Sequence, residues 1–343
     1  PRGFFPPEMA YNDKVGAVVR DLGYQWIILD ELAYAGKLGA IDWTKLYTLQ
    51  GTDDFYVFFR ERETSFRILS AEIAAPGMLL QLLKQRVQQD EYLITAMDGE
   101  TFGHHRPGLD AMLFDLYQAS ELDSKRISDL IPLFTKAQPI KPRPSSWALM
   151  MRDIEQNTPF SRWQDKDNVI HRLQWELTNQ AIGIVHTTPA DDPSYTEIRA
   201  QLDQALHSDQ YWWASAMPWW SIEMIERGAK DLLSVILQSS AGEEEKRRAQ
   251  ERYYAILTNA FDWQRRGIVD ERAKLSDEDV TQRITTDMPY IPEKEFNKII
   301  ANLEKQMLEA ADTKEYERAA QIRDRITELN DKKEQLTKQR HDT

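Results

Sequence analysis

The sequence has no cysteine among its 343 residues. Disulfide bonds, thiolate metal ligands and a cysteine nucleophile are therefore excluded. No apolar run approaches the roughly 20 residues that a membrane-spanning helix needs. Positive charge is also in deficit, because 43 Lys and Arg stand against 56 Asp and Glu, which gives a formal net charge of -13. Such a chain repels phosphate backbones, so we expect neither nucleic acid nor a membrane as a partner.

The first residue is Pro1, and no signal-peptide pattern precedes the first acidic motif. We therefore interpret the chain as a fragment whose N-terminal portion is missing, and we expect this fragment alone to be inactive. The absence of cysteine is typical of a reducing compartment, so the cytoplasm is the expected location.

What the sequence does contain is a pair of acidic motifs, GFFPPEMAY at residues 3–11 and MDGETFGHH at residues 97–105. Each surrounds a carboxylate, Glu8 or Asp98, with aromatic, Gly, Pro or His residues. Two carboxylates in shaped surroundings are typical of glycoside chemistry. One attacks or stabilises the anomeric carbon, and the other carries a proton near neutral pH.

The N-terminal part alternates strands and helices. Apolar patterns predict a helix over 12–22, strands over 24–29 and 55–59, a helix over about 76–89 and a strand over 92–97. Each strand ends in polar residues, as catalytic strands do in parallel (β/α) barrels. These residues are Asp30, Glu31, Arg60, Asp98 and Glu100. The pattern predicts an α/β fold, a partial barrel of parallel strands.

Beyond the barrel the pattern becomes helical. We divide the chain into a barrel part over 1–138, an α-helical region over 139–267 that completes the active-site cleft, a linker over 268–295 and a helical hairpin over 296–336. Residues 109–136 are predicted to be helical, and a proline-rich connector follows from Pro139 to Pro144. The hairpin has two apolar faces at helical spacing. They comprise Ile300, Leu303, Met307, Leu308 and Ala311, and Tyr316, Ala319, Ala320, Ile326 and Leu329.

Several residues allow a plainer interpretation. Taken alone, Glu8 fits a helix-start acid and Asp98 a turn residue; the two motifs together favour catalysis. Asp30 and Glu31 point to opposite sides of a strand, so at most one faces the cleft. Arg60 also fits an ion-pair anchor. The tryptophans at 212, 213, 219 and 220 are more often core, and we expect one of them to be a sugar platform.

The ordered motifs resemble glycoside hydrolase family 57. Residues 3–11 resemble the family's aromatic-x-Pro-Glu-x-x-Tyr motif, and residues 97–105 its Asp-x-Glu-x-Phe-Gly-His motif. Residues 58–65 (FFRERETS) are similar to its Phe-Arg-Asp-x-x-Leu-Ser segment, with Glu and Thr substituted. Residues 208–213 (SDQYWW) are similar to its Ser-Asp-x-x-Trp-Trp stretch. The family's His-Gln-Pro motif and the glutamate motif after it are absent from the chain.

The resemblance implies a retaining enzyme that acts on α-glucans, as a hydrolase or a glucanotransferase. Glu8 would be the nucleophile and Asp98 the general acid/base, with their carboxyl groups roughly 5–5.5 Å apart. No cofactor and no metal are expected, because adjacent histidines do not share one coordinating face. The remaining candidates are substrate-binding residues. They are Tyr11, Asp30, Glu31, Arg60, Glu100, His104, His105, Asp209, Trp212 and Trp213.

The C-terminal hairpin resembles the UVR motif, a small coiled hairpin that serves protein–protein contact. We therefore expect it to bind a protein partner or a second copy of the chain. An alternative function follows, a catalytically inactive glycan-binding or regulatory protein that acts through this hairpin. A carbohydrate deacetylase, a third possibility, needs a metal triad that the sequence does not supply.

Overall fold

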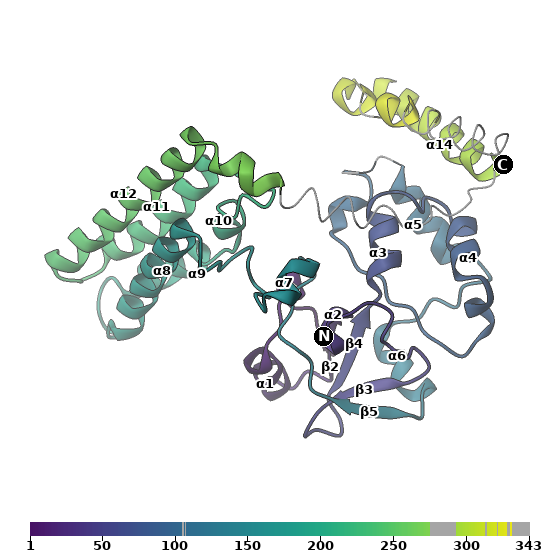
Figure 1. Cartoon of the computed structure of the whole chain (residues 1–343), viewed down its shortest axis with the longest axis horizontal. Coiled ribbons are helices and arrows are strands. Elements are labelled where there is room, and N and C mark those ends of the chain that lie inside the picture. The colour runs from purple at the N-terminus through teal and green to yellow at the C-terminus, as the bar shows by residue number, and fades with distance from the viewer. Residues whose placement is uncertain are drawn as a thin grey trace. The chain divides into compact units, whose positions relative to one another are not determined.

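The computed structural model describes residues 1–104, 106, 108–274, 293–312, 314–320, 322–327 and 330. The chain forms two compact units (Figure 1). One comprises Pro1–Trp147 with Asp287–Thr343, and the other comprises Ala148–Thr286. The division of the chain at 138, 267 and 295 stays a prediction. None of the helices in the described ranges is long and apolar enough to cross a membrane.

The first unit is built on a five-stranded sheet in the order β1-β2-β4-β3-β5. The strands are β1 (Gly3–Phe4), β2 (Trp26–Asp30), β3 (Leu46–Leu49), β4 (Tyr56–Arg60) and β5 (Ala137–Ile140). β1, β2 and β4 are parallel neighbours. The predicted α/β class and both early strands are confirmed, because their continuous apolar runs place them at the centre of the sheet.

Three strands of the sheet, β1, β3 and β5, were missed by the sequence prediction. β3 pairs antiparallel with β4, through a turn in which Gly51 has a φ of 86°. β5 pairs parallel with β3 and contains Pro139, so part of the predicted proline-rich connector is a strand. Proline has no amide hydrogen to donate, and it fits here because β5 lies at the sheet's edge.

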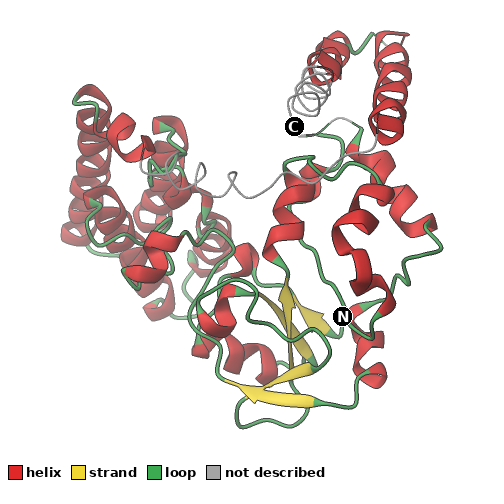
Figure 2. Cartoon of the chain, turned by 45° about the vertical axis from the view of Figure 1, so that its right-hand side comes forward, coloured by secondary structure: helices red, strands yellow, loops and turns green. Residues whose placement is uncertain are grey.

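Helices follow and separate the strands of this unit along the chain (Figure 2). They are α1 (Asp13–Asp21), α2 (Leu32–Ala35), α3 (Arg62–Leu69), α4 (Pro76–Leu83), α5 (Leu109–Gln118) and α6 (Ile127–Leu130), with the 3-10 helices η1 (Pro7–Met9), η2 (Lys84–Gln88), η3 (Gly99–Thr101) and η4 (Ile131–Leu133). The predicted helix over 12–22 is confirmed as α1. The Asn12 side chain caps its N-terminus by accepting a hydrogen bond from the Val15 amide.

The predicted strand over 92–97 is wrong. This segment forms no strand, although it lies against the polar end of β4. Its backbone bonds go to scattered partners: the Tyr92 amide donates to the Trp43 carbonyl, and the Glu61 amide donates to the Ile94 carbonyl. Because no neighbouring strand offers a continuous row of partners, no ladder forms. The helix expected over 109–136 is likewise broken, into α5, α6 and η4.

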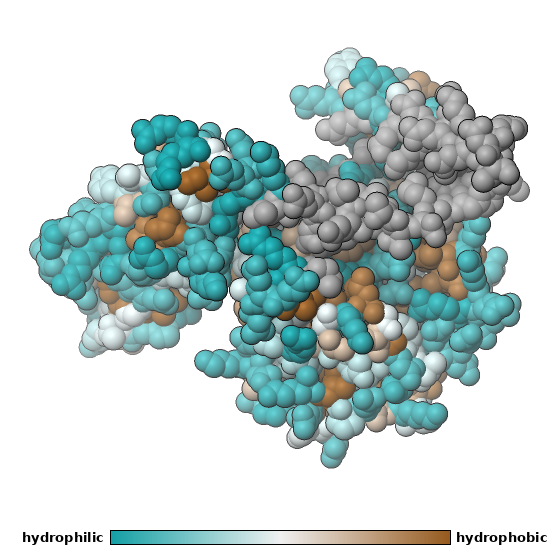
Figure 3. All heavy atoms as spheres, in the orientation of Figure 1, coloured by the Kyte–Doolittle hydropathy of each residue, from teal (hydrophilic) through white to brown (hydrophobic). Residues whose placement is uncertain are grey.

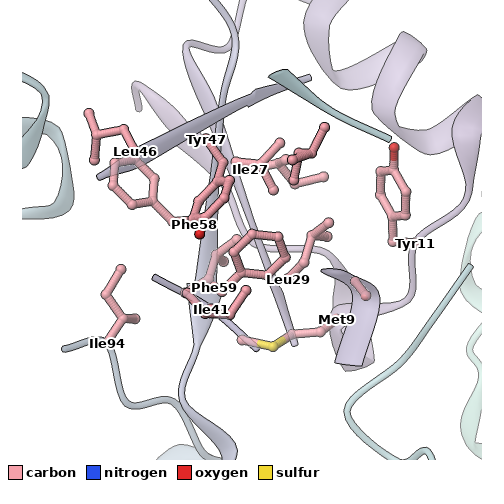
Figure 4. Packing of buried hydrophobic residues seen from close by; sticks show 14 of the residues in the cluster. Met9, Tyr11, Ile27, Leu29, Ile41, Leu46, Tyr47, Phe58, Phe59 and Ile94 are labelled. Carbon is pink, nitrogen blue, oxygen red and sulfur yellow. The ribbon is translucent and has the colours of Figure 1, made fainter. Parts of the chain in front are cut away.

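The core of this unit gathers on β2 and β4. Ile27, Leu29, Phe58 and Phe59 are at most 2% exposed and pack with residues of the N-terminal segment (Figure 4). Met9 belongs to the same cluster, directly beside Glu8 in the chain. The acidic motif at residues 3–11 is thereby anchored in the core by its own apolar members.

The second unit is helical, as the sequence predicts. Its helices are α7 (Met151–Glu155), α8 (Val169–Thr187), α9 (Tyr195–Ala205), α10 (Asp209–Trp212), α11 (Ile222–Gln238) and α12 (Glu243–Arg265). The apolar faces of α8, α9, α11 and α12 form one buried cluster, and hydrophilic side chains dominate the face that Figure 3 shows. Residues 268–274 of the predicted linker are helical, and residues 275–292 lie outside the described residues.

The C-terminal hairpin is present. α14 (Glu293–Asp312) is followed by helical residues 316–320 and 322–327, and Leu303 and Ala310 pack with Ile322 in a small cluster of their own. Leu308 and Tyr316, which we had placed on the apolar faces, are 62% and 68% exposed. Leu329 and the last residues of the predicted hairpin lie outside the described residues.

Candidate active site

Glu8 stands in a strained turn. Its backbone is left-handed, with φ 58° and ψ 16°, and Met9 follows with a φ of 47°. Residues other than glycine rarely adopt this region, at a cost of about 1–3 kcal/mol each. The Met9 amide donates to the Pro6 carbonyl at 2.8 Å, and Met9 itself is fully buried. The core thus holds the turn through Met9, and the Glu8 side chain beside it is half-buried.

The Glu8 segment pairs with residues 145–147. Tyr11 and Ser145 exchange both backbone hydrogen bonds, at 2.8 and 3.0 Å, and the Trp147 amide donates to the Glu8 carbonyl at 3.0 Å. The Trp147 indole Nε1 also donates to Glu8 Oε2, at 2.7 Å. A hydrogen bond this short to a charged oxygen is of the stronger kind. No local sequence pattern predicts this contact, because the two residues are 139 positions apart.

A buried ion cluster lies at the ends of β2 and β4, and its Arg60 contacts the Trp147 ring. Asp30 and Arg60 are register partners, so the parallel ladder brings their side chains together. Arg60 Nη1 and Arg62 Nη1 each donate to Asp30 Oδ2 at 2.9 Å. The three side chains are at most 4% exposed. The sequence analysis did not single out Arg62. With Arg62 in place, the Asp30 carboxylate pairs with two cations instead of one.

The Arg60 guanidinium also contacts Trp147, the hydrogen-bond partner of Glu8. Its Nε donates to the Ala96 carbonyl at 2.7 Å, and its Cζ lies 5.5 Å from the centre of the Trp147 ring. Burial lowers the pKa of Arg60, while the Asp30 charge opposes that shift. The ion pair with Asp30 matches the interpretation of Arg60 as an ion-pair anchor.

Glu31 is buried as well, at 3% exposed. Its two carboxylate oxygens accept from the amides of Arg62, at 2.7 Å, and Gly39, at 3.2 Å. Burial raises the pKa of Glu31, and the two amide bonds act against that rise. Asp30 and Glu31 therefore both serve the framework here, and a contact of either with substrate stays a prediction.

Asp98 lies at the start of η3 and is exposed. Its carbonyl accepts from the Thr101 amide at 3.0 Å, and the Glu100 carbonyl accepts from the His104 amide at 3.2 Å. Glu100 and His104 are exposed like Asp98, and His105 lies outside the described residues. The second motif is thus a compact turn in which Asp98, Glu100 and His104 are exposed and Thr101 is buried.

Tyr11 takes a different position from the one expected of a substrate contact. It is 1% exposed and packs on Gly16, where an added Cβ would stand 3.0 Å from the tyrosine oxygen. Burial, with a smaller contribution from the Asp13 charge, raises the pKa of Tyr11 to about 12. The phenol therefore stays neutral and anchors the motif, and a role in substrate binding remains untested.

The candidates at Asp209, Trp212 and Trp213 belong to the second unit. Asp209 begins α10 and is exposed, whereas Trp212 and Trp213 are half-buried. Trp212 lies 5.3 Å from the Trp163 ring, and Trp213 meets the edge of Trp219 at 5.7 Å. Trp219 is 48% exposed, which makes it the most accessible of the four predicted sugar platforms. Within the described residues, no group of three His, Asp or Glu could hold a metal ion.

Comparison with known proteins places this geometry in context. Residues 1–143 match the model of glycosyl hydrolase family 57, and residues 297–332 match that of the UvrB/uvrC motif. Both resemblances are thereby confirmed for those residues. The search of curated proteins gave no match.

Two solved structures are similar to the chain. A 4-alpha-glucanotransferase from Thermococcus litoralis has a TM-score of 0.48 and 14% identity, over 68% of this chain and 42% of that one. The alpha-amylase AmyC from Thermotoga maritima has a TM-score of 0.43 and 12% identity, over 84% of this chain and 64% of that one. The chain thus spans less than two thirds of either protein.

Proposed function

We propose that the protein is a retaining glycoside hydrolase or glucanotransferase that acts on α-glucans. Glu8 is the nucleophile and Asp98 the general acid/base. The match of residues 1–143 to glycosyl hydrolase family 57 supports the reaction class, and the two motifs within that match support the residues.

The observation that carries the proposal is the geometry of Glu8. The Glu8 carboxylate stands on a left-handed turn and accepts a hydrogen bond from the Trp147 indole. The Trp147 ring in turn contacts Arg60 of the buried ion cluster. An acid that only begins a helix needs none of these contacts. Backbone strain of this kind collects at functional sites, where the surrounding structure holds it. If Glu8 were only an acid at the start of a helix, its strained left-handed backbone would have no explanation.

The chemistry proceeds in two steps. Glu8 attacks the anomeric carbon while Asp98 gives its proton to the leaving glycosidic oxygen, which forms a glycosyl ester on Glu8. Asp98 then takes a proton from water or from a sugar hydroxyl, whose oxygen displaces the Glu8 carboxylate. Water as the acceptor makes the enzyme a hydrolase, and a sugar acceptor makes it a glucanotransferase. The product profile from maltooligosaccharides distinguishes the two.

The test uses Glu8→Gln and Asp98→Asn in the intact protein. We expect Asp98→Asn to lower turnover about 10²- to 10⁴-fold and Glu8→Gln at least as much, because the variant forms no covalent intermediate. Asp54→Asn is the matched control, since Asp54 is exposed in the turn before β4. Early products analysed by proton NMR should keep the anomeric configuration of the substrate. Near-normal turnover in either variant, or inverted product, would contradict the corresponding assignment.

A second candidate function rests on the C-terminal hairpin. The match of residues 297–332 to the UvrB/uvrC motif supports a protein-contact module, in which charged outer faces set register. In this alternative the first unit binds glucan without turnover, and the hairpin recruits a protein partner or a second copy. Glucan binding by the intact protein, with no product from any α-glucan, would favour this alternative.

A further inference from the structure

We propose that Trp147 is a positioning residue for Glu8, and that its indole N–H stabilises the Glu8 carboxylate as this group leaves the glycosyl-enzyme. The inference rests on the proposed function, because it assumes that Glu8 forms the covalent intermediate. Trp147 lies outside both acidic motifs and beyond residue 143, where the family match ends.

Two contacts tie Trp147 to Glu8. The Trp147 amide donates to the Glu8 carbonyl at 3.0 Å, and the indole Nε1 donates to Glu8 Oε2 at 2.7 Å. The first fixes the backbone of the nucleophile and the second fixes its carboxylate. Any residue except proline can make the first contact at position 147, but the second needs a side-chain donor placed where the indole N–H stands.

The indole is itself held in place. The edge of Phe5 meets the Trp147 ring at 5.7 Å with an interplanar angle of 73°, and the Arg60 guanidinium lies 5.5 Å from the ring centre. Arg60 in turn is fixed by its ion pair with Asp30. The buried cluster therefore gives a rigid support to the donor that holds Glu8, which is how a site keeps a reacting group in its productive geometry.

This arrangement acts most strongly when the ester breaks. As the acceptor oxygen bonds to the anomeric carbon and its proton passes to Asp98, the bond from that carbon to the Glu8 oxygen breaks and its electron pair returns to Glu8. The carboxylate gains negative charge during this step. A hydrogen bond to an ionised acceptor is about twice as strong as one to a neutral acceptor. The indole N–H therefore stabilises the transition state of ester breakdown more than the ester itself.

The test compares Trp147→Phe with Trp147→His in the intact protein. Phe keeps a ring and loses the N–H. The imidazole of His overlays the five-membered part of indole, with its Nε2 where Nε1 stood, so His restores the donor. Trp26→Phe is the matched control, because Trp26 also donates an indole hydrogen bond, to Ser128 Oγ at 3.0 Å, in the same unit.

The substrate is an α-maltosyl fluoride, whose good leaving group makes ester breakdown the slow step. The measurement is the decay rate of the Glu8 adduct, followed by mass spectrometry of the quenched protein. We expect this rate to fall about tenfold in Trp147→Phe, to recover most of that loss in Trp147→His, and to be unchanged in Trp26→Phe. Thermal unfolding checks each variant, and Trp147→Met replaces Trp147→Phe if the latter does not fold.

Unchanged decay in the Phe or Met variant would overturn the role of Trp147 and leave the proposed function intact. Equal slowing in Trp147→Phe and Trp147→His would also overturn it, because ring size and not the N–H would then be responsible. A glucan-active protein that forms no adduct on Glu8 would overturn the assigned nucleophile, and this inference with it.

Discussion

Replacement of Asp30 by Asn tests the buried ion cluster. Asparagine keeps the shape of the side chain and the oxygen that accepts from the Leu32 amide at 3.1 Å. It removes the negative charge that two guanidinium groups share, each at 2.9 Å. Arg60 and Arg62 would then be two uncompensated cations at positions that are only 3% and 4% exposed.

The expected cost follows from that burial. Removing one partner of a buried ion pair costs about 3–5 kcal/mol, because the remaining charge stays desolvated without a counter-charge. A typical domain has only about 5–15 kcal/mol of stability in all. Asp21→Asn provides the comparison, since Asp21 pairs with Arg20 on the surface, at 65% and 44% exposed. A surface pair of this kind is worth about 0–1 kcal/mol.

The assay is amide hydrogen exchange of peptides that cover β2 and β4, because a chain with two units has no single unfolding transition. A loss of about 3 kcal/mol accelerates the slowest amides by more than about 100-fold in Asp30→Asn. Asp21→Asn should leave their exchange within about fivefold of normal. If the two variants exchanged at similar rates, the cluster would not stabilise this unit and our account of the ends of β2 and β4 would be incorrect.

Two further predictions concern the helices. Burial lowers the pKa of His171 from 6.5 to about 4, and its neutral ring accepts from the Asp165 amide and donates to the Tyr211 carbonyl. The unfolded chain takes up a proton first, so this contribution to the stability of the second unit is complete above pH 6.5 and declines by about 3 kcal/mol as the pH falls to 4. Hydrogen exchange of α8 should show that loss, and His171→Gln but not His186→Gln should remove its pH dependence. Deletion of residues 293–343 should change the oligomeric state or a captured partner, measured by light scattering and pull-down, and leave glucan turnover unchanged. Loss of turnover in a folded deletion variant would place the hairpin in the active site.

Part of the fold could be predicted from local pattern. The apolar runs of β2 and β4 predict buried strands because both faces of a central parallel strand are covered. α1 was predictable from its 3–4 spacing and from Asn12 and Gly23 at its ends. The apolar stripes of the hairpin predicted that Leu303 and Ile326 lie on facing helices, and they do share a cluster.

The local sequence pattern did not predict the structure of segments whose backbone hydrogen-bond partners lie far away in the chain. Residues 92–97 have the composition of a strand, yet their hydrogen bonds go to Trp43, Glu61 and Ser65, which form no continuous edge. β5 includes a proline and pairs with β3, some ninety positions earlier in the chain. Neither outcome follows from the properties of the segment itself.

The sequence by itself determined which residues carry the candidate chemistry, because the motifs at 3–11 and 97–105 are contiguous and can be recognised without a fold. Only the tertiary structure decided how their neighbours are used. It buried Asp30, Glu31 and Arg60 in the framework, left Asp98 exposed, and brought Trp147 to the Glu8 carboxylate. The physical reason is that burial and ion pairing depend on which strands become neighbours. That choice pairs strands as far apart in the chain as β3 and β5, and the fold also brings Trp147 to Glu8 across 139 positions, through contacts that no local pattern records.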